Sequence, residues 1–321
     1  MRRPGIGHGL SVRMALWLLL SLIAIVQAQE QSVFVIRVTG SIDGGLVPYV
    51  HRVLRQAETQ GAQAVIVHID TPGGRADAAT QIRDALLNTP VRTIALIDKK
   101  ALSAGALIAL ACQEIYMTGG SVMGAAAPVS INGQPMSEKT VSAIRKLFRA
   151  TAEHHGRSPE VAEAMVDADV AVAGVAEAGK LLTLSTQEAL NLNIANGQVD
   201  SLASLLEQLS IPDYAVTQAT WNWAEWLVQV LTQWPIPAIL LLVGCLALWV
   251  EFIEPGFSLG GIIGLICLGL FFGSHHLIGL AGWEEALLIG LGLMFLAGEF
   301  FVLPGFGIAG ILGIIALQQS K

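Results

Sequence analysis

The chain has 321 residues, of which 53% are hydrophobic and 13% are charged, and its mean hydropathy is +0.61. These values exclude an ordinary soluble protein, so we expect part of the chain to lie in a membrane. Acidic residues outnumber basic residues by 25 to 18, giving a net charge of −7, which argues against nucleic acid as a partner.

Residues 1–28 are typical of a cleaved secretory signal peptide. Arg2, Arg3 and Arg13 precede the apolar stretch Met14–Val26, and small residues flank Gln27 at the expected cleavage site. The apolar stretch is shorter than the about 20 residues that cross a bilayer. An uncleaved anchor is the alternative. If the signal is cleaved, the next domain lies outside the cytoplasm.

Residues 29–212 have the pattern of an α/β domain. Apolar, β-rich runs predict strands at Val33–Val38, Ala64–Asp70 and Val91–Asp98. Amphipathic helices are expected between them, one ending near Gly61 and one at Ala76–Leu87. This alternation predicts a mainly parallel sheet whose functional sites lie at the carboxyl ends of the strands. The second half is expected to hold further helices and one short strand, at Arg145–His155, Pro159–Ala168, Lys180–Leu184 (the strand) and Thr186–Leu209.

Residues 213–234 form a tryptophan-rich linker. Its four tryptophans favour the boundary between lipid and water, and they are Trp221, Trp223, Trp226 and Trp234. We therefore expect this linker to hold the preceding domain at the membrane surface.

Residues 235–321 are expected to form a transmembrane helical bundle. Apolar runs predict up to four helices, at Ile236–Phe252, Leu259–Phe272, Ala286–Val302 and Ile308–Leu317. The segment beginning Pro255-Gly256-Phe257 recurs as Pro304-Gly305-Phe306, so a helix pair with glycines for close packing is duplicated. Glu251, Glu254 and Glu299 border the repeated turns and are expected at helix ends near the interface. No lysine or arginine lies between Lys180 and Lys321, so the positive-inside rule gives no orientation.

The cysteines and histidines predict neither disulfides nor a metal site. The three cysteines form an odd set, and two of them lie in long apolar segments. No histidine combines with cysteine or carboxylate at the spacing of metal ligands, and no phosphate-binding glycine loop is present. We expect no metal and no cofactor.

A candidate catalytic group lies where two predicted strands end. Ser103 follows the third strand and opens a helix, where backbone N–H groups and the helix dipole would suit attack on a carbonyl. Pro72-Gly73-Gly74 closes the preceding strand, and Lys139 is a candidate base. Taken alone, Ser103 is better explained as a helix cap. Its neighbours favour the nucleophile.

Five ordered motifs resemble the NfeD family of membrane-bound serine proteases, from about residue 32 to the end of the membrane segment. They are Asp70–Gly74, Ser103–Ala106, Ser121–Val129, Ser137–Lys139 and Gly179–Thr183. The resemblance implies a ClpP/crotonase-like α/β fold of repeated ββα units and a serine–lysine dyad. Ser103 would be the nucleophile and Lys139 the base, with Gly73, Gly74 and Ala104 supplying the oxyanion-hole amides.

The resemblance also implies a function and a location. It points to a membrane-anchored serine endopeptidase that cleaves apolar segments of stomatin- or prohibitin-like membrane proteins. It implies a homodimer or larger homo-oligomer in contact with lipid, multi-pass in a prokaryotic inner membrane, with the protease domain on the periplasmic side. Long family members continue into a soluble β-barrel, whereas this chain stops at Lys321, so that module is expected to be absent or supplied by another chain.

The assigned base places a requirement on the fold. A lysine accepts a proton only in its neutral form, so Lys139 is expected in a desolvated position. Val129, Ile131, Val141 and Ile144 are apolar neighbours in sequence, and Glu138 is expected to point away.

Histidine is the competing base. His68 lies on one strand face with Asp70, and His154 or His155 could fold back towards the serine. His68 falls within a buried strand, so we interpret it as a core histidine with a hydrogen-bonded partner.

Two other classes of function stay open. One is a crotonase-type enzyme acting on an acyl thioester, which the secretory signal disfavours because coenzyme A thioesters are cytosolic. The other is a non-catalytic membrane scaffold. A fluorophosphonate probe separates them, since only the protease should be labelled at Ser103.

Overall fold

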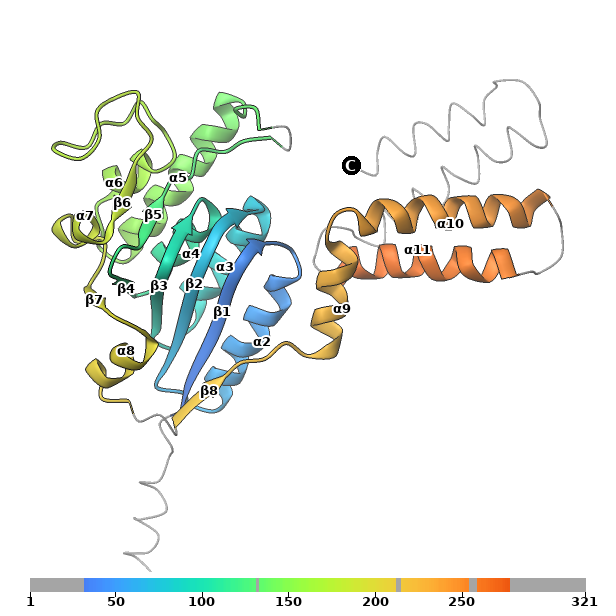
Figure 1. The fold of residues 1–321 in the computed structure, drawn as a ribbon, viewed down its shortest axis with the longest axis horizontal. Coiled ribbons are helices and arrows are strands. Elements are labelled where there is room, and N and C mark those ends of the chain that lie inside the picture. Colours follow the sequence, from blue (N-terminus) through green and yellow to red (C-terminus); the bar gives the residue numbers. More distant parts are fainter. Residues whose placement is uncertain (1–31, 131–132, 212–214, 254–258, 278–321) are drawn as a thin grey trace, which may run out of the picture.

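The computed structural model describes residues 32–130, 133–211, 215–253 and 259–277, which form an α/β domain followed by helices (Figure 1). The strands are β1 (Val33–Ile42), β2 (Ala64–Gly74), β3 (Thr93–Leu102), β4 (Glu114–Thr118), β5 (Val122–Gly124), β6 (Thr183–Ser185), β7 (Gly197–Val199) and β8 (Val216–Gln218). The helices of the α/β domain are α2 (Leu46–Thr59), α3 (Ala76–Asn88), α4 (Ala104–Leu110), α5 (Glu138–His154), α6 (Pro159–Ala164), α7 (Thr186–Asn191) and α8 (Leu202–Gln208). They are followed by α9 (Trp223–Thr232), α10 (Ile236–Ile253) and α11 (Leu259–Leu277). The predicted signal peptide, Ile131, Glu254, the repeated turns and the last two predicted membrane helices lie outside the described residues.

The sheet is mainly parallel and forks at β3. Its strand order is β6-β5-β3-β2-β1-β8, and β4 and β7 form a side branch. β3 pairs with β4 through Ile94–Ile97 and with β5 through Lys100–Leu102, so its neighbour changes just before Ser103. Only the β5–β6 pair is antiparallel among the described strands. The predicted α/β domain with a mainly parallel sheet is confirmed.

Apolar side chains cover both faces of the central strands. The first residues of β2, Ala64–Val67, are all buried, because α2, α3 and α4 cover one face while α8 covers part of the other. On the α8 side, Ile66 and Leu96 pack with Leu205 in a smaller cluster. The nearly continuous apolar run at Ala64–Asp70 predicted this double coverage.

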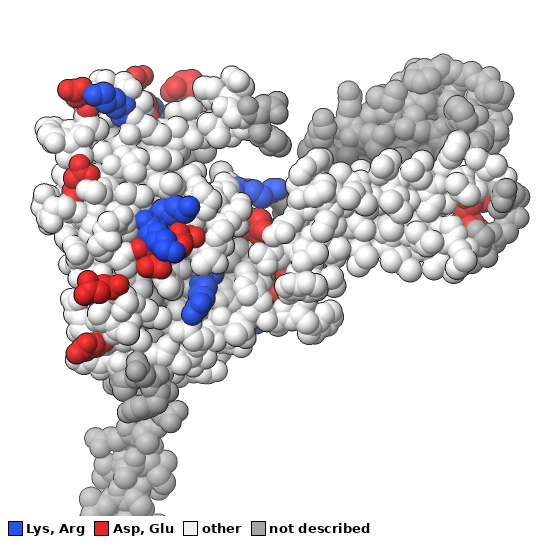
Figure 2. All heavy atoms as spheres, in the orientation of Figure 1, with Lys and Arg blue, Asp and Glu red and all other residues white. Residues whose placement is uncertain are grey.

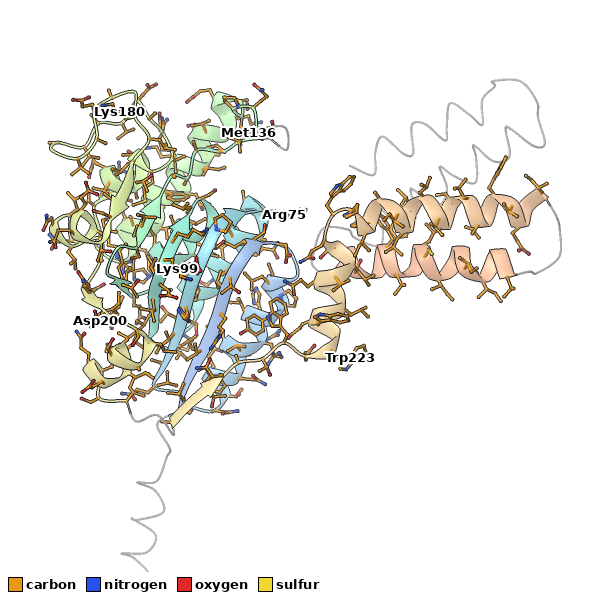
Figure 3. The ribbon with its side chains drawn as sticks, viewed as in Figure 1. Arg75, Lys99, Met136, Lys180, Asp200 and Trp223 are labelled. Carbon is orange, nitrogen blue, oxygen red and sulfur yellow. The ribbon has the colours of Figure 1, made fainter. Side chains whose placement is uncertain are left out.

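The α/β domain extends beyond the expected boundary at residue 212. β8 lies in the segment that we expected to be a linker, and it pairs with β1 through Val33–Val35. Trp221 stacks on Tyr49, with ring centroids 4.5 Å apart and planes 9° apart. Trp221 is therefore part of the domain, whereas Trp223, Trp226 and Trp234 are exposed. Figure 3 labels Trp223 at the start of α9. The boundary was missed because three-residue strands carry little sequence pattern.

The helix α9 is docked on α2 by a partly buried ion pair. Arg52 on α2 donates two hydrogen bonds to the carboxylate of Glu225, at 2.5 and 2.9 Å, and a third to the Thr220 carbonyl at 2.8 Å. At the other end of the contact, Gly45 lets the backbone of α9 approach α2 closely, because a Cβ there would lie only 2.7 Å from the Cα of Gln229. These contacts hold α9 against the α/β domain.

We expect Glu225→Gln to lower the free energy of unfolding by about 2 kcal/mol, because it leaves the Arg52 guanidinium without its charged partner. The effect falls below that of a fully buried pair because the Arg52 side chain is 27% exposed. Urea unfolding of the purified chain measures it. The matched control is Glu177→Gln, which breaks an exposed pair with Lys180 and should change stability by less than about 0.5 kcal/mol.

The helices α10 and α11 pack closely through glycines. A Cβ on Gly264 would lie 2.6 Å from the side chain of Leu248, and one on Gly244 would lie 3.0 Å from Leu268. The Glu251 carboxylate accepts a hydrogen bond of 2.8 Å from the Gly261 amide in the first turn of α11. The predicted use of glycine for close packing is confirmed for this helix pair.

The surface of α10 and α11 is nearly free of charge, in contrast to the α/β domain (Figure 2). Within the described residues, no helix by itself is long and apolar enough to cross a membrane. Two consecutive helical segments, Trp223–Thr232 and Ile236–Glu251, have the required length and composition together, with a bend of 79° between them. Leu259–Ser274 is a shorter apolar helix.

Candidate active site

Ser103 occupies a sharp turn between β3 and α4. Its backbone has φ 52° and ψ −119°, a conformation that a non-glycine residue adopts at an energetic cost. The Ser103 amide donates to the Gly124 carbonyl at 2.8 Å, which fixes the turn against the end of β5. The Ser103 hydroxyl is half-buried and makes no hydrogen bond with the described residues. The helix-cap interpretation is therefore wrong, and the hydroxyl is free to react.

Gly73 approaches Ser103 more closely than any other residue type could. A Cβ on Gly73 would lie 2.6 Å from the Ser103 Cβ and 3.2 Å from its Oγ, and the φ of Gly73 is +111°. Gly74 faces β1 instead, where a Cβ would lie 2.1 Å from the Ile42 carbonyl oxygen. The two glycines thus serve different contacts. Gly73 lies at the hydroxyl, and Gly74 lets β1 approach.

Two kinds of backbone donor lie beside the hydroxyl. Ala104 and Gly105 are the first residues of α4, so their N–H groups have no acceptor within the helix. The Gly73 N–H donates to the hydroxyl of Thr71 at 3.0 Å. The Ala104 amide could donate a hydrogen bond to an oxyanion at this position directly. The Gly73 amide could do so only after its hydrogen bond to the Thr71 hydroxyl breaks.

Thr71 is a site residue to which the sequence analysis gave no role. It is completely buried, and its hydroxyl donates to the Gly40 carbonyl at 2.5 Å while accepting from Gly73. The Thr71 methyl group packs directly against Gly105, since a Cβ on Gly105 would lie only 2.4 Å from it. Thr71 therefore links β1, the glycine pair and the first turn of α4. Its place next to Pro72 was the only signal in the sequence.

We expect Thr71→Val to lower kcat for peptide hydrolysis about tenfold, because the end of β2 that carries Gly73 loses its hydrogen bond to the Gly40 carbonyl on β1 and is no longer held in place beside Ser103. Stability should fall by about 1–3 kcal/mol, since the buried Gly40 carbonyl loses its donor. Thr71→Ser keeps the hydroxyl and should restore most of the activity. If Val and Ser variants are equally active, Thr71 contributes packing alone.

Lys139 forms no hydrogen bond with Ser103 in this structure. It lies in the first turn of α5, its side chain is exposed, and it makes no hydrogen bond or ion pair with the described residues. The expected desolvation is therefore wrong for the part of the chain that the structure describes, because none of its segments covers this turn. Glu138 does point elsewhere, lying 3.9 Å from Arg145. Figure 3 labels Met136, just before α5, and Arg75, just after the glycine pair.

The competing histidines are held away from Ser103. His68 is opposite Leu96 in the sheet, roughly 20 Å along the strand from Ser103. Its Nε2 lies 3.6 Å from a carboxylate oxygen of Asp98 rather than Asp70, and it is half-buried rather than a core residue. Burial lowers the pKa of His68, although the charge of Asp98 opposes this shift. His155 contacts the Ala111 carbonyl at 3.0 Å, beyond the far end of α4.

Cys112 is excluded as a nucleophile. It is completely buried, and burial raises the pKa of its thiol to about 12, so the reactive thiolate does not form at neutral pH. Among the described residues, no group of histidine, cysteine and carboxylate side chains could hold a metal ion.

Comparison with known proteins extends these observations along the chain. Residues 32–219 match the N-terminal domain of NfeD1b, and residues 235–320 match the NfeD integral membrane domain. Membrane protein NfeD1b of Bacillus subtilis is 37% identical over 288 residues, covering 88% of this chain and 66% of the relative. Membrane-bound protease PH1510 of Pyrococcus horikoshii is 25% identical over 294 residues, covering 84% and 63%. The chain thus spans less than two thirds of each relative's length.

Two solved structures share the fold of the N-terminal domain. Both are of the 1510-N membrane-bound stomatin-specific protease. A lysine-to-alanine variant in complex with a substrate peptide has a TM-score of 0.53 at 24% identity, covering 63% of this chain and 98% of that chain. A serine-to-alanine variant has a TM-score of 0.51 at 24% identity, covering 60% and 99%.

The fold and the matched membrane domain define a membrane protein with an N-terminal α/β domain. The chain belongs to the NfeD family. The resemblance carried by the five sequence motifs is thereby confirmed, and the relatives include a membrane-bound protease.

Proposed function

We propose that this chain is a membrane-bound serine endopeptidase with Ser103 as nucleophile. The observation that carries the proposal is the turn at Ser103, where a strained backbone holds an unbonded hydroxyl against Gly73 and the start of α4. Backbone strain of this kind is retained at functional sites when the surrounding structure enforces it. Here the Gly124 carbonyl and the buried Thr71 supply that support.

The geometry suits acyl transfer. Ser103 Oγ would attack the substrate carbonyl and pass its proton to the neutral amine of Lys139. The Ala104 N–H, joined by that of Gly73, would stabilise the oxyanion, and Lys139 would return the proton to the leaving amine. Water would then hydrolyse the acyl-enzyme by the same steps.

Closure of the site is part of this proposal. Lys139 is exposed in the isolated chain, so bound substrate or a second copy in a homo-oligomer would have to cover the first turn of α5. That cover would desolvate the amine and favour its neutral form. A non-catalytic scaffold is the alternative that the exposed Lys139 favours.

The substrate class follows from the relatives and the membrane domain. The solved 1510-N protease is described as stomatin-specific, and we extend this to a stomatin- or prohibitin-like membrane protein here. Three exposed tryptophans of the segment around α9 would lie at the lipid surface, and a cleaved signal would place the α/β domain on the periplasmic side of a multi-pass membrane protein. Apolar segments at the bilayer surface would then reach Ser103.

Reconstituted protein tests this function. The full chain in liposomes should cleave a bilayer-associated apolar peptide and yield two fragments, while Ser103→Ala yields none. A crotonase-type enzyme would instead turn over an acyl thioester without cleaving peptide. Peptide binding without fragments from the native chain would indicate a scaffold.

A further inference from the structure

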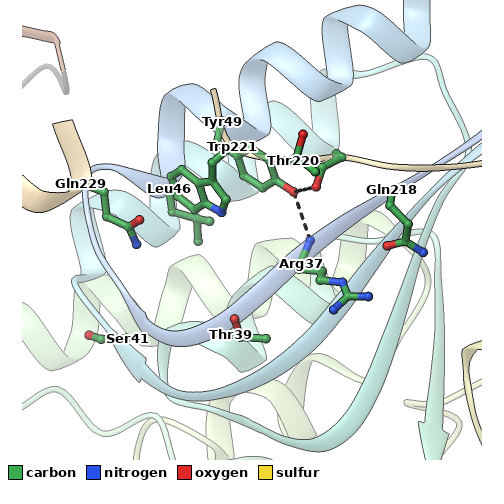
Figure 4. A pocket seen from close by; sticks show the side chains of 10 residues that line it. Arg37, Thr39, Ser41, Leu46, Tyr49, Gln218, Thr220, Trp221 and Gln229 are labelled. Carbon is green, nitrogen blue, oxygen red and sulfur yellow. Dashed lines mark hydrogen bonds between the residues drawn. The ribbon is translucent and has the colours of Figure 1, made fainter. Parts of the chain in front are cut away.

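A separate pocket of about 580 Å³ lies at the outer edge of β1 (Figure 4). Arg37 and Thr39 from β1 line it, together with Tyr49 from α2, Trp221 after β8 and Gln229 on α9. None of these residues belongs to the candidate active site.

Part of the main chain of β1 is unpaired at this pocket. β8 pairs with β1 only at Val33–Val35. Beyond it, the Val35 carbonyl accepts a hydrogen bond of 3.0 Å from the Ala219 amide. The Arg37 amide donates to the Tyr49 hydroxyl at 3.4 Å. Because outward-facing residues alternate along a parallel strand, the Arg37 carbonyl and both backbone groups of Thr39 face the same edge. No described strand pairs with them.

Arg37 is the charged residue of this pocket, and its guanidinium is unpaired. It is exposed and makes no hydrogen bond or ion pair with the described residues. Every other arginine that the structure describes bonds through its side chain, namely Arg52, Arg55, Arg75, Arg83, Arg92, Arg145, Arg149 and Arg157. A guanidinium beside a hollow matches a carboxylate, which it binds with two parallel hydrogen bonds.

The pocket also has an apolar wall. The stacked rings of Tyr49 and Trp221 stand above β1 next to Leu46 (Figure 4). An aliphatic side chain would be covered there. Backbone groups, a cation and an apolar wall are the elements by which a sheet edge binds an extended peptide.

We propose that this pocket binds a short extended peptide segment that carries a carboxylate. The segment adds to β1 at Arg37 and Thr39, its carboxylate pairs with Arg37, and an apolar side chain lies on the Tyr49–Trp221 pair. Ser41 on β1 also lines this pocket, and it is paired with Gly73 in the sheet. The pocket therefore holds a partner protein beside the site of Ser103, next to α9. The inference goes beyond the proposed hydrolysis, because binding here needs no catalysis.

The test measures peptide binding to the full chain in detergent, in a Ser103→Ala background so that cleavage cannot intervene. The probe is a fluorescein-labelled hexapeptide of alternating valine and threonine with one central glutamate. Its binding affinity is measured by fluorescence anisotropy. Arg37→Gln should weaken binding about tenfold, as expected for a lost charge-assisted pair. Thr39→Pro should weaken it similarly by removing the amide donor, whereas Thr39→Ala keeps that donor and should bind normally. Arg55→Gln, on α2 outside the pocket, is the control for loss of charge.

A second probe isolates the ion pair. The second peptide has glutamine in place of the central glutamate. We expect the protein with Arg37 intact to bind it about tenfold more weakly than the glutamate peptide. The Arg37→Gln variant should bind the two peptides with equal affinity, because the ion pair is already lost. Equal affinity of the unsubstituted protein and Arg37→Gln for the glutamate peptide would overturn the proposal. It would also be overturned if Arg37→Gln or Thr39→Pro converted an oligomer to monomer in sedimentation, because a second copy would then occupy the edge.

Discussion

Replacement of Ser103 by alanine is expected to abolish peptide hydrolysis and to leave the fold intact. Alanine adopts φ 52° at the same backbone cost as serine and keeps the Cβ against Gly73, so only the nucleophile is lost. Lys139→Ala should reduce the rate at least about 10³-fold, and the double variant should be no slower than either single variant, because the two groups act as a unit. Rates of peptide cleavage in liposomes measure this, with unfolding curves to check the fold.

The control for this pair is Lys99→Ala, which removes another exposed lysine of the domain and should leave the rate unchanged. Near-normal hydrolysis by Lys139→Ala, together with its loss in His155→Ala or His68→Ala, would assign the base to histidine.

Gly73→Ala is expected to have the second largest effect. The new Cβ would lie 2.6 Å from the Ser103 Cβ, so either the serine or the glycine strand must move, and φ +111° is strained for alanine. We expect hydrolysis to fall at least about 10²-fold, the size of effect seen when an oxyanion donor is lost. Peptide cleavage by the purified variant measures it.

The matched control is Gly120→Ala. Gly120 has φ +78°, but nothing lies within 4 Å of a Cβ placed there. We expect Gly120→Ala to lower the free energy of unfolding by about 1 kcal/mol because of backbone strain. Its rate of peptide hydrolysis should stay within about twofold of the unsubstituted protein. Equal activity of the two alanine variants would contradict the close contact between Gly73 and the nucleophile.

The sequence predicted the elements that carry a repeating pattern. The strands β1 to β3, the helices between them and the placing of Ser103 and Gly73 at strand ends follow from apolar runs and turn residues. The strands β4, β5, β7 and β8 were not predicted, because three to five residues are too few for a periodic signal.

Contacts between segments far apart in the chain could not be predicted from the sequence. The role of Thr71 depends on Gly40, 31 residues away, and the docking of α9 depends on an ion pair between residues 173 apart. Whether Lys139 is covered depends on what packs on α5, which no local pattern encodes. The residue types of the candidate site could thus be predicted, but their contacts could not.

The most direct measurement is labelling by a fluorophosphonate followed by mass spectrometry of the peptides. We expect one adduct, on Ser103, in the folded chain in liposomes. It should be absent in Ser103→Ala and strongly reduced in Lys139→Ala. An unlabelled Ser103 in a chain that still cleaves peptide, or an adduct on another residue whose replacement stops cleavage, would contradict this expectation.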